Sequence, residues 1–111
     1  MQTDLAVRCL SALGHPRRLD VYRLLLRHAP DGLNAGDIAS AFDQPASTMS
    51  SQLRILTEAG LVVSERRGRE IYFRPDIDRM RGLILFIVAD CCGGQAERYE
   101  PLLADLLPCC P

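Results

Sequence analysis

The chain has 111 residues, 48% of them hydrophobic, which is enough for the core of one domain and too few for two. Its 13 basic residues are outnumbered by 14 acidic ones, and the formal net charge of -1 excludes the overall basic excess of many nucleic-acid-binding proteins. The longest apolar run, residues 83–89, is far shorter than the roughly 18 residues that span a bilayer, and the amino end does not resemble a secretory signal. We therefore expect one cytoplasmic domain over residues 1–111, with no membrane partner.

Helix-breaking residues and apolar periodicity predict five helices. The first ends where Gly14 and Pro16 follow. Asn34 and Asp76 suit the caps that begin two later helices. We expect His15, between the first two helices, to be a structural turn residue rather than a ligand. The predicted helices are residues 5–13, 16–27, 33–42, 45–61 and 76–91.

The helix over residues 45–61 is the element around which the chain is organised. Pro45 suits its first turn, and Gly60 suits its end. An apolar stripe for packing recurs at helical spacing, at Met49, Leu53, Leu56 and Ala59. The opposite face carries short hydroxyls and hydrogen-bond donors, which can reach phosphates and base edges. The residues of this polar face are Ser47, Thr48, Ser50, Ser51, Gln52 and Arg54.

A basic hairpin is predicted next, with strands at residues 61–64 and 70–73. Its tip holds a turn glycine and three cations, Arg66, Arg67 and Arg69. Residues 47–74 contain five arginines and three glutamates, a local surplus of two positive charges. The two preceding helices have helix-turn-helix spacing. These elements predict a mainly α fold with a small β-hairpin (α+β), a winged helix-turn-helix that binds double-stranded DNA.

The last predicted helix indicates how the chain assembles. Its centre, LILFIVA, is apolar on every side and must be covered on every side. In so small a domain the nearest cover is a second copy of the chain, so we expect a two-fold homodimer. The first and last helices would pack across the axis. Such symmetry also suits paired half-sites on an operator.

Three segments resemble the ArsR/SmtB family of metal- and metalloid-responsive repressors: LGHPRRLDVYRLLL, DIASAFDQPASTMSSQLRILTEAGLV and the RRGREIYF hairpin. The resemblance covers about residues 7–88 and implies a dimeric repressor, not an enzyme, that leaves its own operator when an inducer binds. It places residues 47–52 at the major groove and residues 66–69 beside the backbone or minor groove. The family often has His-His where Ser51-Gln52 stand here, so the base preference of the family cannot be carried over to this chain.

The inducer is argued from the cysteines, because the family places its sensing sites differently in different members. Residues 33–42 hold no cysteine, and the only histidines, His15 and His28, lie near the second helix, so two familiar family sites are absent. An odd number of cysteines in a cytosolic chain favours free thiols over disulfides. Thiolates bind soft metal and metalloid ions in preference to hard ones. We therefore predict As(III) or Sb(III) as the inducer. The five cysteines are Cys9, Cys91, Cys92, Cys109 and Cys110.

Cys91 and Cys92 are the predicted centre of this site. Adjacent residues diverge on a continuous helix, but Gly93-Gly94 follows and would let the last turn bend until both sulfurs converge. For Cys9 itself we favour burial in the core. Ion binding would change the angle between the protomers and release the operator. The candidates for the third sulfur are Cys109 and Cys110, in the tail of residues 93–111, or Cys9 of either protomer.

Three alternatives remain open. The same thiols could sense oxidants or persulfides, which requires a lowered thiolate pKa. Residues 92–98 match C-x5-R, the oxyanion loop of phosphatases and some arsenate reductases, although here the match follows a helix and 13 arginines make chance matches common. Finally, the domain could be a constitutive DNA-binding module with inert thiols.

Overall fold

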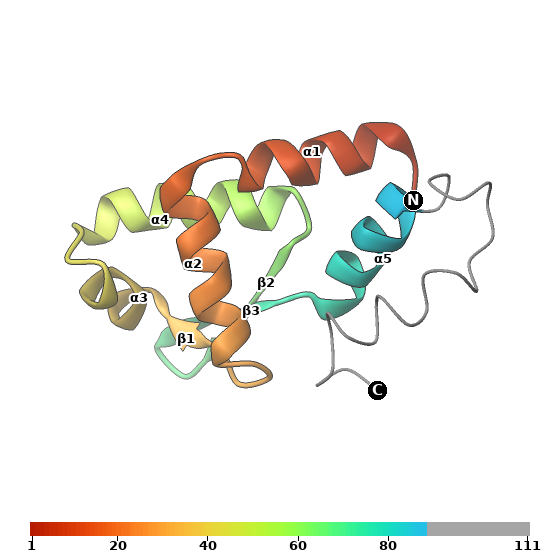
Figure 1. Ribbon diagram of the computed structural model, residues 1–111. Coiled ribbons are helices and arrows are strands. Elements are labelled where there is room, and N and C mark those ends of the chain that lie inside the picture. Colours follow the sequence, from red (N-terminus) through yellow and green to blue (C-terminus); the bar gives the residue numbers. More distant parts are fainter. Residues whose placement is uncertain (89–111) are drawn as a thin grey trace.

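The computed structural model describes residues 1–88, and residues 89–111 lie outside the described part. Within residues 1–88 five helices and a small sheet form a winged helix-turn-helix, as predicted (Figure 1). No helix in this part is long and apolar enough to cross a membrane. The elements are α1 (Thr3–Leu13), α2 (Pro16–Arg27), β1 (Leu33–Asn34), α3 (Ala35–Ala41), α4 (Ala46–Glu58), β2 (Val62–Arg67), β3 (Glu70–Pro75) and α5 (Ile77–Val88).

Side-chain caps explain where three of the helices begin. The Asn34 side chain accepts a hydrogen bond from the Asp37 N–H at 2.8 Å. The Asp76 carboxylate accepts one from the Arg79 N–H at 3.0 Å, so both predicted caps are confirmed. His15 Nδ1 accepts a hydrogen bond from a backbone N–H in the first turn of α2, at 3.1 Å, which gives His15 a structural role.

The helix α4 follows α3 after a tight turn and packs against α1, α2 and α3. It begins at Ala46, and Pro45 is the extended residue before it rather than a residue of its first turn. Gly60, just past its end, has a φ of +80°, a conformation that favours glycine. The chemical signals in the sequence therefore place this helix to within a few residues.

Three antiparallel strands form the sheet, in the order β1-β3-β2. β2 and β3 pair along their whole length, and only Gly68 and Arg69 form the turn between them. The predicted strands, 61–64 and 70–73, are therefore too short, because Arg66 and Arg67 belong to β2 rather than to the tip. We call β2, β3 and their turn the wing.

The two-residue strand β1 was not predicted. Leu33 pairs with Phe73 and Asn34 with Tyr72, so the chain joins the sheet before it turns into α3. The helix consequently starts two residues later than predicted. The partners of β1 lie far along the chain in β3, and a local sequence pattern cannot indicate such a pairing.

The core lies against the inner side of α4 and receives residues from every described helix. The predicted apolar stripe of α4 is confirmed, because Met49, Leu53 and Leu56 are between 0% and 1% exposed. Cys9 is also fully buried, as expected for a core residue. The other buried core residues are Ala6, Ala12, Val21, Tyr22, Leu25, Ile38, Ala39, Ala59, Leu61, Val62 and Leu83.

Candidate nucleic-acid interface

The polar face of α4 is open to solvent. Ser51 Oγ donates a hydrogen bond to the Ser47 carbonyl at 3.3 Å, which leaves the hydroxyl oxygen as an acceptor for an outside partner. Arg54 forms no hydrogen bond or ion pair within residues 1–88, so its guanidinium is available to an anion. The predicted contact residues that are exposed on this face are Ser47, Thr48, Ser50, Ser51 and Arg54.

Gln52 does not share this exposure. Its side chain is half-buried, and its carbonyl Oε1 accepts a hydrogen bond from Arg18 Nη1 at 3.2 Å. Gln52 therefore turns toward α2, unlike the exposed residues with which the sequence pattern groups it. Any contact that it makes with DNA must start from this constrained position.

Arg18 is a residue that the sequence reasoning did not single out. Its Nε donates to the Ala12 carbonyl at 2.6 Å, and its Nη2 donates to the Ser11 carbonyl at 3.4 Å. These carbonyls lie at the end of α1, where a helix leaves acceptors unpaired and attracts cations. One guanidinium thus joins the end of α1 to the middle of α4. An arginine just after a helix break is a usable signal, but the contact with α4 depends on tertiary packing.

Arg67, a predicted DNA contact, is engaged within the protein. Its Nη2 donates to the Asp31 carbonyl at 3.1 Å and to Glu65 Oε2 at 3.3 Å, and its guanidinium carbon lies 4.5 Å from the centre of the Tyr72 ring. The same Glu65 carboxylate oxygen is 4.0 Å from Arg74 Nε. One carboxylate therefore offsets part of two positive charges. The positive potential of the wing is smaller than its arginine count suggests.

The remaining cations stand at the tip of the wing. Arg66 Nε donates to the Gly68 carbonyl within the turn, at 3.3 Å. Arg69 has no hydrogen-bond or ion-pair partner in the described part of the chain. A Cβ added at Gly68 would meet no atom within 4 Å, so the tip projects into open space. Arg66 and Arg69 are therefore the wing cations best placed for a phosphate backbone.

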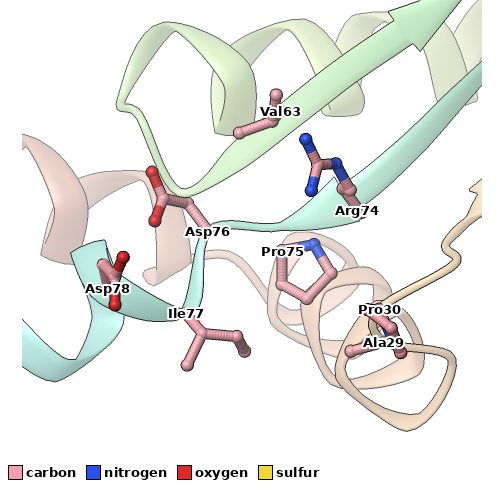
Figure 2. A pocket seen from close by; sticks show the side chains of 8 residues that line it. All are labelled: Ala29, Pro30, Val63, Arg74, Pro75, Asp76, Ile77 and Asp78. Carbon is pink, nitrogen blue, oxygen red and sulfur yellow. The ribbon is translucent and has the colours of Figure 1, made fainter.

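A cavity of about 350 Å³ lies where the sheet meets α5 (Figure 2). Arg74 contributes a positive charge to it, and Asp76 and Asp78 contribute negative charges. Asp76 already caps α5. None of the predicted DNA contacts lines the cavity, so it is separate from the α4 face and the wing tip. Its lining residues are Ala29, Pro30, Val63, Arg74, Pro75, Asp76, Ile77 and Asp78.

A thiol and a phenol are buried in the core. Cys9 Sγ donates a hydrogen bond to the Ala59 carbonyl, just after α4, at 3.4 Å. Burial raises the pKa of the Cys9 thiol, against smaller opposing effects of two nearby arginines. Burial, together with Asp76 and Cys9, also raises the pKa of the Tyr22 hydroxyl. Both groups stay neutral at neutral pH, so Cys9 lacks the thiolate character of a reactive cysteine.

The predicted thiolate site falls outside the described residues. Within residues 1–88 no three histidine, cysteine or acidic side chains gather in a way that could hold a metal ion. α5 is described as far as Val88, and the predicted ligands follow it in the sequence: Cys91, Cys92, Cys109 and Cys110. The site therefore stays a prediction.

Comparison with known proteins gives one family match and several relatives. Residues 13–65 match the family described as a Helix-turn-helix domain. The Biofilm growth-associated repressor of Agrobacterium fabrum is 32% identical over 93 residues, covering 84% of this chain and 76% of that protein. The homodimeric winged helix-turn-helix DNA-binding domain of a possible ArsR-family regulator from Mycobacterium bovis is 34% identical, with a TM-score of 0.64, covering 78% of this chain and 80% of that one. A possible transcriptional regulator for arsenical resistance is 29% identical, with a TM-score of 0.59, covering 86% of this chain and 93% of that one.

Proposed function

This chain belongs to the ArsR/SmtB family of transcriptional repressors, and we propose that it binds operator DNA as a homodimer and leaves it when As(III) or Sb(III) binds its thiolates. The polar face of α4 is the main support for this proposal. Its short hydroxyl side chains are exposed, and the buried apolar side chains on the opposite face hold the helix in position. Short side chains allow close approach to base edges, and the Arg54 guanidinium, which has no partner within residues 1–88, can meet a phosphate. The tip cations Arg66 and Arg69 would then lie beside the DNA backbone.

The apolar residues exposed on α1 and α5 support the dimer. α5 and the start of α1 lie at one end of the molecule, and α3 and the wing tip lie at the other (Figure 1). A second copy seated on α1 and α5 would bury these side chains and leave both DNA-binding surfaces open. The relative from Mycobacterium bovis is a homodimer, which supports a dimer for this chain. The exposed residues are Val7 (57%), Leu10 (47%), Leu85 (44%) and Ile87 (47%).

The inducer is proposed from the chemistry of the cysteines that follow α5. Cys91 and Cys92 stand three and four positions after Val88 in the sequence, and thiolates select thiophilic ions over hard ions. The relative that is a possible regulator for arsenical resistance agrees with this ion class. Cys9 is not a candidate ligand while α1 keeps its packing, because its thiol is fully buried and protonated. The remaining sulfur would come from Cys109 or Cys110.

Release requires only that the ion change the geometry of the dimer. If α5 contributes to the dimer contact, an ion bound just beyond it would alter the angle between the protomers. The two α4 helices would then no longer match half-sites one helical turn apart. A coupling of about 1.4 kcal/mol already weakens operator affinity tenfold, within the usual range for linked sites.

Operator binding measured with and without arsenite tests this proposal. A duplex selected by the wild-type chain from a random pool is labelled, and its affinity is followed by fluorescence anisotropy with a phosphine reductant, which keeps thiols reduced without adding a competing thiol. We expect arsenite to weaken wild-type binding at least tenfold. The double variant Cys91→Ser/Cys92→Ser should stay bound, and the matched control Cys9→Ala should be released like the wild type.

Each other outcome removes a part of the proposal. Release that persists in the Cys91→Ser/Cys92→Ser variant eliminates the vicinal thiolates as the site. Release by an oxidant in a separate titration without the reductant, with none by arsenite in its presence, assigns the chain to thiol-based redox or persulfide sensing. Failure of the wild type to enrich any duplex contradicts DNA binding itself.

A further inference from the structure

Among the described residues, one contact holds the side chain of Gln52, and it holds only the carbonyl end of the amide. Arg18 Nη1 donates to its Oε1 at 3.2 Å, and Arg18 is itself anchored on the carbonyls of Ala12 and Ser11. Within residues 1–88 no protein atom accepts a hydrogen bond from Gln52 Nε2. The carbonyl end of this amide is therefore fixed, and its amino end is available to a partner.

Hydrogen-bond chemistry decides which way this amide faces. A guanidinium has five N–H donors and no acceptor, so only the carbonyl oxygen of Gln52 can face Arg18. Nε2 and its two N–H groups must then lie on the other side of the amide. Because Arg18 is tied to the end of α1 and also to α4, this orientation belongs to the folded chain before any DNA arrives.

A recess beside Gln52 gives a partner room to reach the amide. It has a volume of about 360 Å³ and lies between the start of α2 and the middle of α4. Gln52 is the residue that α4 contributes to its lining. Its lining residues are His15, Pro16, Arg17, Asp20, Gln44 and Gln52.

We propose, resting on the operator binding argued above, that Arg18 is a positioning residue that makes Gln52 a hydrogen-bond donor toward DNA. A free glutamine commonly pairs with adenine through both ends of its amide, accepting from N6 and donating to N7. Arg18 already occupies one of the two lone pairs of Oε1 and holds that end of the amide, so Gln52 meets DNA chiefly through the two N–H groups of Nε2. These two donors match guanine, whose N7 and O6 are both acceptors, or a phosphate oxygen, whereas adenine presents an N6 donor beside its N7 acceptor.

Repeated selection from a random duplex pool, read by sequencing, tests this assignment. The wild type should select a G·C pair at one position in each half-site. Gln52→Ala should lose that preference and bind the wild-type duplex about fivefold less tightly per half-site, the worth of roughly one hydrogen bond. Arg18→Met frees the amide and should move the preference at the same position toward adenine. The matched control is Arg23→Met, which removes an exposed α2 arginine that has no polar partner within residues 1–88.

A second variant keeps the test decisive if Arg18→Met does not fold. Gln52→Glu keeps an acceptor for Arg18 and removes the donor, so the preference should move to cytosine, whose N4 amino group donates to a carboxylate. Its folding is checked by its thermal midpoint. A merely structural Gln52 would lower stability and leave the base preference of the chain unchanged.

The outcomes separate the two sources of the acceptor and the two proposals. If Gln52→Ala weakens selected and unrelated duplexes alike, the acceptor is a phosphate oxygen. An A·T pair at the Gln52-dependent position in the wild type overturns the inference, as does a Gln52→Ala variant that binds and selects like the wild type. In both cases the wild type still selects a duplex, so operator binding survives. Loss of all selection by the wild type defeats operator binding instead.

Discussion

The helix α4 and the wing form one proposed DNA surface, but different forces hold them in place. α4 stands on Met49, Leu53 and Leu56, which are between 0% and 1% exposed. In the wing, β2 buries only Val62, and Arg67 holds its outer part through polar and ring contacts. The helix is therefore positioned by apolar packing, and the wing by strand pairing together with charged contacts at Arg67 that salt can screen. Substitutions beneath α4 should cost stability, and those at the wing tip should cost DNA affinity.

The largest expected effect is in the core beneath α4. Leu53→Ala should lower the free energy of unfolding by about 3 kcal/mol, because it removes buried methyl groups and leaves a cavity. Its control in the wing, Ile71→Ala, truncates a side chain that is 49% exposed and should cost less than about 1 kcal/mol. Urea unfolding of both variants measures the difference. Equal losses would show that the wing is packed as firmly as the helix.

Two glycines with positive φ sharpen the comparison at the end of α4 and at the wing tip. Gly60 has a φ of +80°, and an added Cβ would lie 3.1 Å from Arg79 Nε, whereas Gly68 has a φ of +65° and open space around it. Gly60→Ala should therefore lower the free energy of unfolding by about 2 kcal/mol. Gly68→Ala should lower it by about 1 kcal/mol, which is the cost of holding an alanine at positive φ without any steric clash. Thermal unfolding compares them. A larger loss at Gly68 would contradict the open environment of the tip.

Alkaline pH should weaken the core beside α4. The pKa values of Cys9 and Tyr22 are raised by burial, so the folded chain keeps protons that the unfolded chain releases above about pH 9 for a thiol and pH 10 for a phenol. Their contribution to stability is complete below those values and is lost as pH rises toward the raised ones. Urea unfolding from pH 7 to pH 11 should show this decline. Tyr22→Phe should flatten it above pH 10, and an unchanged decline would contradict the raised pKa.

The smallest expected effect separates two wing arginines. Arg69→Ala removes a cation that is unpaired in the described part of the chain, and it should reduce the slope of log affinity against log salt by about 0.9 per protomer, the value for one phosphate contact. Arg67→Ala removes a charge already shared with Glu65 and should change the slope less. Anisotropy titrations at several salt concentrations measure both slopes. A larger change for Arg67→Ala would mean that it, rather than Arg69, meets the backbone.

The sequence alone predicts the features that depend on residues close together in the chain, above all the positions of the helices. Caps such as Asn34 and Asp76, and the apolar stripe of α4, locate the helices because their partners lie within a turn or two. β1, the pairing of Arg67 with the Asp31 carbonyl, and the contact of Arg18 with Gln52 were missed. Each depends on residues more than 30 positions apart, which only the folded chain brings together.

The most direct test of the central claim, that two α4 helices occupy adjacent major grooves, is a chemical footprint of the full chain on its selected duplex. The account predicts two patches of guanine N7 protection about 34–36 Å apart, one helical turn. It also predicts minor-groove or backbone protection beside them that Arg69→Ala removes. A single patch, or protection confined to the minor groove, would contradict the account.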